Sequence, residues 1–246
     1  MSLSVCIITR NEESNLERTL SSIRDIATEI VIVDSGSTDK TKEIALSFNA
    51  SFFSEEWKGF VRQKNSALEK CTQKWILCID ADEVPDDELK KQISEAIDND
   101  SPFSYKINIR SFYLSKLLNH TWQPEWKLRL VRSDASPEWS GGDVHESLNV
   151  NNEIKKIKGF LIHYSYRDLE HHIEKLKSYS LLTAKSMKRE GKKFHYFNLY
   201  INPVINFIKM YIVHLGFMDG KRGLTASRIS AYGTYLKYKY LKDLWK

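Results

Sequence analysis

The sequence contains little glycine, proline or cysteine, and two common nucleotide-binding motifs are missing from it. Its 246 residues include 10 glycines, 5 prolines and 3 cysteines. This composition argues against a long disordered segment. Neither G-x-G-x-x-G nor G-x-x-x-x-G-K-[ST] occurs, so the dinucleotide fingerprint and the P-loop are both lacking. The sequence therefore disfavours a nicotinamide-dependent enzyme and a P-loop NTPase.

Disulfide, export and membrane-spanning signals are also weak. Cys6 and Cys78 lie in apolar runs and Cys71 ends a helical pattern, which predicts buried thiols in a reducing cytoplasm. The N-terminus has no basic region followed by an apolar stretch, so no signal peptide is predicted. The uncharged segment 197–208 contains Pro203 and is too short to span a bilayer.

Charge is distributed unevenly along the chain. Residues 1–100 contain 12 Lys and Arg against 20 Asp and Glu, whereas residues 151–246 contain 19 against 7, a net charge of +12. Apolar and aromatic residues are interspersed with the basic ones after residue 190. This pattern predicts an anionic partner, such as a membrane surface or a lipid-linked substrate, for the C-terminal part. A solvated basic helix face is the alternative.

The first 110 residues alternate between strand and helix patterns. Apolar strands separated by helices predict an α/β fold with a mostly parallel central sheet. The predicted strands are 3–9, 29–34, 50–53, 74–80 and 104–109, and the helices between them are centred on 16–23, 40–48, 59–71 and 86–98. A short strand, 126–131, and a loop containing 141–146 should follow, and long basic helices after residue 162. His171 and His172 fall in a Lys/Glu-rich stretch and are expected at the surface.

Polar clusters follow three of the strands, at 9–13, 34–39 and 80–82. Ligands bind such sheets at the carboxyl ends of the strands, so the clusters should meet at one edge. Asp80 and Asp82, two residues apart, suit a hard divalent cation, although a solvated acidic loop would look the same. Ser37 has an alternative role as a cap of the following helix.

Four motifs together resemble the inverting glycosyltransferases of family 2, which have the GT-A nucleotide-sugar fold. They are residues 5–13 (VCIITRNEE), 30–39 (IVIVDSGSTD), 64–65 (KN) and 79–83 (IDADE). Further along, residues 126–130, 144–146, 163–166 and 216–220 resemble the branch that adds sugars to the lipopolysaccharide inner core.

The resemblance implies a nucleotide-sugar site and a divalent cation, Mg or Mn. Thr9, Asn11, Glu12 and Asp34 would hold the uridine, Lys64 would approach the base or diphosphate, and Asp80 and Asp82 would meet the ribose and the metal. The expected nucleotide-sugar residues also include Ser37, Asn65 and Ala81. Lys127 and Arg129 alternate with leucines on a short strand and would bind phosphate on donor or acceptor.

An inverting transfer needs a base on the face opposite the leaving group. Glu146 is the candidate base. The metal ligands implied are Asp82 with His145 or His163, and the sequence does not choose between the two histidines; for His163 a structural role among tyrosines is the alternative.

The predicted domains are a GT-A catalytic domain, 1–165, with a nucleotide-sugar half, 1–110, and an acceptor half, 111–165, followed by a helical basic region, 166–246. The predicted function is metal-dependent transfer of a hexose, from a UDP-sugar, to a lipid-linked saccharide such as lipopolysaccharide core. We expect a cytoplasmic protein, with peripheral attachment to the inner face of the membrane as a further option, and no nucleic-acid partner. One alternative is a nucleotidyltransferase, although this sequence lacks the glycine-rich loop expected after the first strand of such an enzyme. Another is a non-catalytic protein that binds membranes or anionic polymers.

Overall fold

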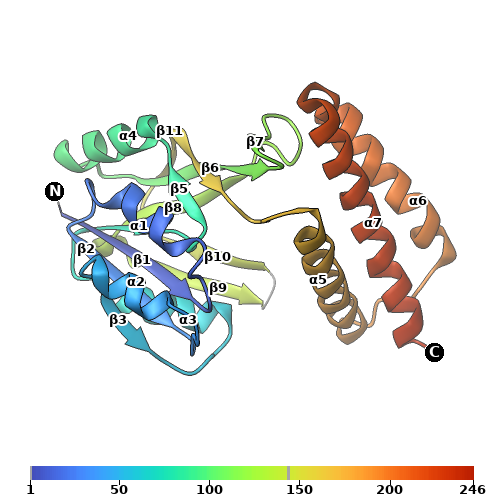
Figure 1. Cartoon of the computed structure of the whole chain (residues 1–246), viewed down its shortest axis with the longest axis horizontal. Coiled ribbons are helices and arrows are strands. Elements are labelled where there is room, and N and C mark those ends of the chain that lie inside the picture. The colour runs from blue at the N-terminus through green and yellow to red at the C-terminus, as the bar shows by residue number, and fades with distance from the viewer. Residues whose placement is uncertain (1, 143–144) are drawn as a thin grey trace. The chain divides into compact units, whose positions relative to one another are not determined.

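A mixed β-sheet organises the N-terminal part of the chain in the computed structural model, which describes residues 2–142 and 145–246, with His145 described by its backbone alone. The strand order is β3-β2-β1-β4-β8-β6-β11-β5 (Figure 1). The strands are β1 (Leu3–Thr9), β2 (Glu29–Asp34), β3 (Ser51–Ser54), β4 (Trp75–Cys78), β5 (Glu83–Pro85), β6 (Ser104–Tyr113), β8 (Trp126–Arg132) and β11 (Ile154–His163).

The first four strands pair in parallel, as the alternating pattern predicts. Beyond them the sheet changes. β8 pairs antiparallel with β4 and with β6, so β6 runs in the direction of β4 without pairing with it. The strand predicted at 104–109, which is β6, therefore does not extend the parallel part of the sheet as the sequence suggested. β8, which comes later in the chain, lies between β6 and β4. The fold remains α/β with a helical C-terminal region.

Helices cover one face of this sheet and form the larger core. They are α1 (Leu16–Ile23), α2 (Thr41–Ser47) and α4 (Asp87–Asp98). The helical spacing of Leu16, Leu20 and Ile23 directs all three side chains into the core, where each is fully buried. The side chain of Asp86 caps α4 by accepting from the backbone N of Leu89 (2.8 Å).

A helix and a β-hairpin cover the other face. The helix is α3 (Phe60–Glu69), and the hairpin pairs β9 (Glu138–Gly142) with β10 (His145–Asn149). Trp139 and Leu148 of the hairpin are buried against Cys6, Cys78 and Leu128 of the sheet. The prediction of a loop is therefore wrong for Gly141, Gly142, His145 and Glu146, which lie in these two paired strands. Residues 143–144 of the predicted loop lie outside the described residues.

Contacts divide the chain into two units. Unit 1 contains the chain up to Ile109 together with Glu125–His163, and unit 2 contains Arg110–Pro124 and Tyr164–Lys246. Unit 2 is built from three long helices and short segments, which Figure 1 draws in green for 110–124 and in brown to red for the helices. Its elements are β7 (Lys116–Leu117), α5 (Leu169–Arg189), α6 (Tyr196–Ile208), the π-helical η2 (Lys209–Val213), the 3-10 helix η3 (Gly216–Asp219) and α7 (Gly220–Leu244).

His172 lies in an aromatic cluster of unit 2, contrary to the surface position expected for it. Its side chain is buried, stacks on Tyr166 with ring centroids 3.8 Å apart, and places Nδ1 2.9 Å from the hydroxyl of Tyr113. Burial lowers the pKa of His172 to about 4. Charged neighbours along the helix misled the prediction, because α5 buries one face against unit 2's own aromatic residues.

The 216–220 segment fastens the short segments of unit 2 together. The carboxylate of Asp219 accepts from the backbone N of Asn119 (2.9 Å), His120 (3.1 Å) and Thr121 (2.8 Å). Three backbone donors on one carboxylate fix the 119–121 turn against the start of α7.

Candidate active site

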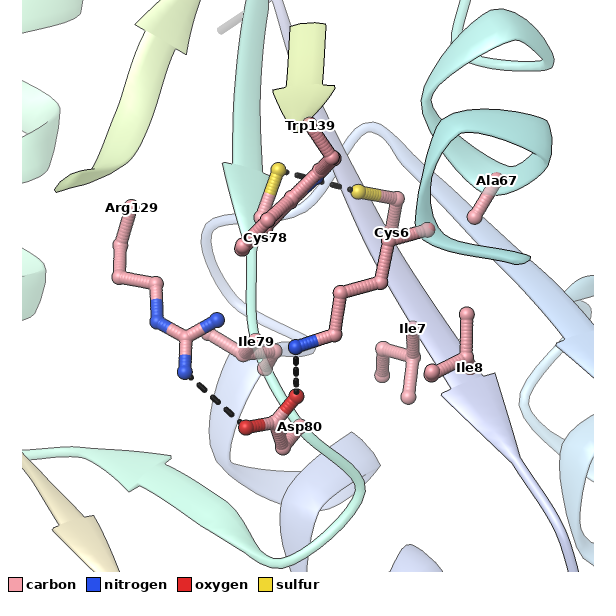
Figure 2. Close-up of a pocket in the computed structure, with 10 residues that line it drawn as sticks. Cys6, Ile7, Ile8, Ala67, Cys78, Ile79, Asp80, Arg129 and Trp139 are labelled. Carbon is pink, nitrogen blue, oxygen red and sulfur yellow. Dashed lines mark hydrogen bonds and ion pairs between the residues drawn. The ribbon is translucent and has the colours of Figure 1, made fainter. Parts of the chain in front are cut away.

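A buried ion-pair cluster lies where β4 ends. The Nη2 atom of Arg129, on β8, lies 3.0 Å from Oδ2 of Asp80 and 3.1 Å from Oε1 of Glu83. Glu83 also accepts from the backbone N of Asp80 (2.9 Å), which closes the 80–83 turn. Figure 2 shows the guanidinium of Arg129 directed at Asp80, with Trp139 lining the same small pocket. The first carboxylate of the Asp-x-Asp motif is thus held by a buried cation.

Charge and burial oppose each other in this cluster. Burial alone would raise the pKa of Asp80, but the charges of Arg129 and Lys64 hold it well below its ordinary value. For Glu83, burial and the charge of Asp80 outweigh Arg129 and raise the pKa. Burial would lower the pKa of Arg129, whereas the two carboxylates raise it. Asp80 is therefore held in its ionised form by two cations, and Glu83 is the carboxyl group whose proton affinity is raised by burial.

Lys64 joins this cluster to the β9–β10 hairpin. It projects from α3, is 8% exposed, and places Nζ 3.3 Å from Oδ1 of Asp80 and 3.0 Å from Oε1 of Glu146. The ammonium also lies 4.6 Å from the ring centroid of Trp139. Burial would lower the pKa of Lys64, but Asp80 raises it and Glu146 adds to the effect. The ammonium group of Lys64 thus links Glu146, the candidate base, to Asp80 of the Asp-x-Asp motif.

Asp82 and His163 form a second pair at this edge. Nε2 of His163, the last residue of β11, lies 3.3 Å from Oδ1 of Asp82, and β11 reaches this position by pairing antiparallel with β5. Burial would lower the pKa of His163, but the hydrogen bond and charge of Asp82, with Glu83 and Asp80, raise it to about 9.

The donor set at this pair suits a divalent cation that keeps other ligands. Across residues 2–142 and 145–246 no three His, Cys, Asp or Glu side chains are already arranged around one point as metal ligands. Mg²⁺ is usually held by one or two carboxylates together with substrate phosphates, so Asp82 would supply an oxygen ligand of that kind, whereas an imidazole beside it suits a transition-metal ion better than Mg²⁺. His163 is close enough to serve, whereas the side chain of His145 lies outside the described residues. The sequence left this choice open.

The predicted uridine residues lie together after β1 and β2. Asp34 is buried, and its carboxylate accepts from Oγ1 of Thr9 (2.8 Å) and from the backbone N of Gly36 (3.0 Å) and Ser37 (2.8 Å). The hydroxyl of Ser37 also donates to it (2.5 Å). Gly36 has a φ of +87°, which its lack of a Cβ permits. Asp34 thus stabilises the turn that follows it, and it lies at the carboxyl end of β2.

The turn after β1 is tied to the turn after β2. Asn11 accepts from the backbone N of Thr38 (2.9 Å) through its amide oxygen, and its own backbone N donates to Ser37 Oγ (2.7 Å). The backbone N of Glu12 donates to Oγ1 of Thr41 (2.8 Å). These hydrogen bonds join the two turns into one continuous polar surface at the carboxyl edge of the sheet.

Asn65 and Ala81 are positioned by backbone contacts. Asn65 exchanges two hydrogen bonds with the backbone of Trp139, at 2.9 and 2.8 Å, and so anchors the hairpin to α3. The carbonyl O of Ala81 accepts from Oγ1 of Thr19 (2.7 Å), which fixes the peptide between Asp80 and Asp82.

A cleft of about 640 Å³ opens beside the cluster, between β8 and the hairpin. Lys64, Asp80 and Glu146 line it, together with Lys106, Trp126 and Lys127. Lys127 is exposed and pairs with Glu125 (2.8 Å), whereas Arg129 is buried. The two basic residues predicted to bind phosphate thus occupy different environments.

Two residues at the centre of the site escaped the sequence-based prediction. Glu83 was seen only as part of the motif, and its burial depends on the return of β11. Trp139 stands in a stretch without strand alternation, so no local signal marked it; its burial comes from the hairpin.

A comparison with known families accounts for this arrangement. The model of the family described as glycosyl transferase family 2 matches residues 4–145, which include Thr9, Asp34, Lys64, Asp80, Asp82 and Arg129 but not Glu146 or His163. The chain belongs to glycosyl transferase family 2. It is therefore a glycosyltransferase, and the polar edge and carboxylate cluster form its candidate active site.

Curated relatives of this glycosyltransferase align over nearly its whole length. The lipopolysaccharide core biosynthesis glycosyltransferase LpsC of Rhizobium meliloti is 30% identical over 96% of this chain and 93% of its own. An uncharacterized glycosyltransferase of Rickettsia typhi is 30% identical over 98% of this chain and 87% of its own. Among solved structures, S. aureus TarS 1-349 in complex with UDP-GlcNAc matches 100% of this chain and 92% of its own, with 14% identity and a TM-score of 0.50. That likeness shows the fold.

Proposed function

We propose that this family 2 glycosyltransferase transfers a hexose from a UDP-sugar, with inversion at the anomeric carbon, to a saccharide carried on a lipid, such as lipopolysaccharide core. The observation that carries the proposal is the convergence of Asp82, His163, Asp80, Lys64 and Glu146 at the carboxyl edge of the sheet. LpsC is named for lipopolysaccharide core biosynthesis, and TarS is described with UDP-GlcNAc. Both names support this choice of substrates.

The donor would lie along the polar edge. The uridine would bind at the end of this edge formed by Thr9, Asn11, Glu12 and Asp34. Hydrogen bonds within and between the two turns preorganise this end for the nucleotide. Asp82 and His163 would hold the divalent cation, Mg or Mn, which when bound stabilises the negative charge that develops on the departing diphosphate. His163 would ligate only in its neutral form, so it would have to lose the proton that Asp82 favours before it could hold the cation.

Glu146 would act as the base. The acceptor hydroxyl gives its proton to the Glu146 carboxylate as its oxygen forms the new bond to the anomeric carbon; the old bond to the diphosphate oxygen breaks, and its electron pair leaves with UDP. Lys64 positions the carboxylate by contacting Oε1. Because Lys64 also contacts Asp80, it couples the base to the donor end of the site.

The acceptor would enter through the cleft between β8 and the hairpin. Trp126 offers a surface on which a sugar ring can stack, and Lys106 and Lys127 place positive charge along the walls. These groups suit a saccharide that bears phosphates or carboxylates. The net charge of +12 over residues 151–246 supports a location at the inner, anionic face of the cytoplasmic membrane.

The experiment is thermal unfolding with Mn²⁺ and a panel of nucleotides and nucleotide sugars. A ligand that binds the native state raises the midpoint, so UDP or a UDP-hexose with Mn²⁺ should raise it for the wild type. Asp82→Asn should abolish the metal-dependent part of the shift. Asp98→Asn, an exposed carboxylate of α4, is the matched control and should keep it. No shift with any nucleotide, or an unchanged shift in Asp82→Asn, would contradict the proposed donor site.

A further inference from the structure

Unit 2 exposes a long run of apolar side chains on α6 and on η2, which follows it. Phe197 is 65% exposed, Val204 is 54% exposed and Val213 is 69% exposed. We call this surface the α6 face; it comprises Tyr196, Phe197, Tyr200, Ile201, Val204, Ile205, Ile208, Ile212 and Val213, each at least 40% exposed. Contiguous apolar surface of this extent marks an interaction site.

Three uncharged polar side chains in and next to the same segment form hydrogen bonds with the rest of unit 2. Asn202 Nδ2 donates to the hydroxyl of Tyr238 (2.8 Å), and Asn206 Nδ2 donates to Oγ1 of Thr234 (2.7 Å). His214 Nδ1 donates to the carbonyl O of Gln123 (2.8 Å). A helix that meets water presents its polar side outward and buries its apolar stripe. This segment has the reverse arrangement, which suits an apolar solvent.

The charged side chains in the segment that carries the α6 face are of one sign. Residues 191–218 contain no Asp or Glu, and the three ionised side chains expected there are Lys192, Lys193 and Lys209. Lys193 and Lys209 are both exposed. Lysines beside apolar and aromatic residues are the combination found where a helix lies in the headgroup region of an anionic bilayer.

We propose that the α6 face is a membrane-docking surface, which lies in the boundary between headgroups and acyl chains of a bilayer that contains anionic lipids. No single helix in the described part of the chain is long and apolar enough to cross a membrane, although Tyr196–Val213 and Gly216–Leu244, bent by 72° where they meet, pass that test as a pair. A face on one side of a helix anchored to α7 by asparagines is suited to lying on the bilayer.

A second copy of the chain is a poorer occupant than a lipid surface. A twofold dimer through the α6 face would bring each patch against its own copy. Such an interface would contain Lys193 and Lys209 of both copies, with no acidic side chain in 191–218 to offset them. Anionic headgroups supply the missing opposite charge.

This docking surface deepens the proposed function, because it assigns the membrane contact proposed there from net charge to named residues of unit 2. Vesicle binding is measured without donor, metal or acceptor. Failure of the docking surface and failure of the proposed transfer are therefore separate results.

The test is sedimentation of the full-length protein with vesicles of phosphatidylcholine, with and without phosphatidylglycerol. We expect binding to the anionic vesicles that weakens with salt. Phe197→Ser combined with Val213→Ser should lower the partition coefficient about tenfold or more, because each side chain loses its burial in the acyl region. Lys193→Gln combined with Lys209→Gln should weaken binding to anionic vesicles and leave binding to phosphatidylcholine unchanged.

Matched controls separate the α6 face from general surface effects. Leu182→Ser changes an apolar residue of α5 that is 50% exposed, and Lys91→Gln removes an exposed lysine of α4; both should bind as the wild type does. Light scattering without vesicles should give a monomer for the wild type and for the Phe197→Ser/Val213→Ser variant. Equal loss of vesicle binding in the controls, or a wild-type dimer that the double variant dissociates while vesicle binding persists, would overturn the proposal.

Discussion

The buried guanidinium of Arg129 pairs with the partly exposed carboxylate of Asp80, with Nη2 3.0 Å from Oδ2, and the same nitrogen lies 3.1 Å from Oε1 of the buried Glu83. One guanidinium group thus balances two carboxylates at the end of β4. Removing it leaves the carboxyl group of Glu83 buried without its cation.

Arg129→Met should destabilise unit 1 by about 3–5 kcal/mol, the usual cost of breaking a buried pair from one side. Urea unfolding measures the loss. Adding Glu83→Gln should recover part of it, because the uncompensated carboxylate is then removed. Lys127→Met, on the same strand but exposed, should change stability by less than about 0.5 kcal/mol. A comparable loss in Lys127→Met would show that the strand, and not the ion pair, is responsible.

Glu146→Gln should lower the transfer rate constant by about 10²–10⁴-fold, the typical contribution of a general base. Donor affinity should change little, because the base acts on the transition state. Single-turnover transfer and separate titration of the donor distinguish the two quantities. Glu138→Gln alters an exposed carboxylate of the same hairpin and should leave both unchanged. A parallel fall in donor affinity for Glu146→Gln would count against its role as the base.

Glu55 should make stability depend on pH in the acid range. Hydrogen bonds from Lys70, Lys58 and Ser66 lower the pKa of Glu55 to about 2, below its ordinary value of 4.5. Because the native pKa is the lower one, the stabilisation is complete above about pH 4.5 and is lost as the pH falls toward 2.

The comparison is urea unfolding of the wild type and Glu55→Gln at several pH values. The variant should be less stable by about 2 kcal/mol at pH 6, and the gap should narrow on acidification. Glu56→Gln, an exposed neighbour, should show no such gap. A difference that stays constant with pH would mean that packing, and not charge, makes Glu55 matter.

Gly223→Ala should destabilise unit 2 by about 3 kcal/mol, because a Cβ there would stand 1.8 Å from the backbone O of Gly216. The backbone of Gly216 cannot move aside cheaply, because Asp219, three residues later, is held by its hydrogen bond from Asn119. At Gly233 the added Cβ would meet the flexible end of Leu176 at 2.5 Å, so Gly233→Ala should cost less. Thermal unfolding monitored by circular dichroism ranks the two; a reversed order would contradict this account of the turn.

Local pattern was sufficient for part of this molecule. β1 and β2 have the predicted bounds because both faces of each strand are covered, so the apolar run and the strand coincide. The polar clusters after them were correctly expected to converge, since parallel strands place their carboxyl ends at one edge.

Long-range pairing determined what the pattern missed. The insertion of β8 beside β4 depends on residues about 50 positions apart in sequence, and it brings Arg129 to Asp80. The hairpin that carries Glu146 is rich in glycine and polar residues, and its strand character comes from pairing and from Trp139. The position of His163 likewise follows from the pairing of β11 with β5.

The division of the chain into units has a consequence for protein engineering. The polypeptide passes from one unit to the other at 109–110, 124–125 and 163–164, and β6 itself runs through the first of these points. A cut near residue 163 would leave residues 110–124 behind without the helices that bury Tyr113 and Leu118. Exchanging unit 2 between relatives therefore requires three junctions, and a deletion that respects the architecture must also replace 110–124 with a short linker.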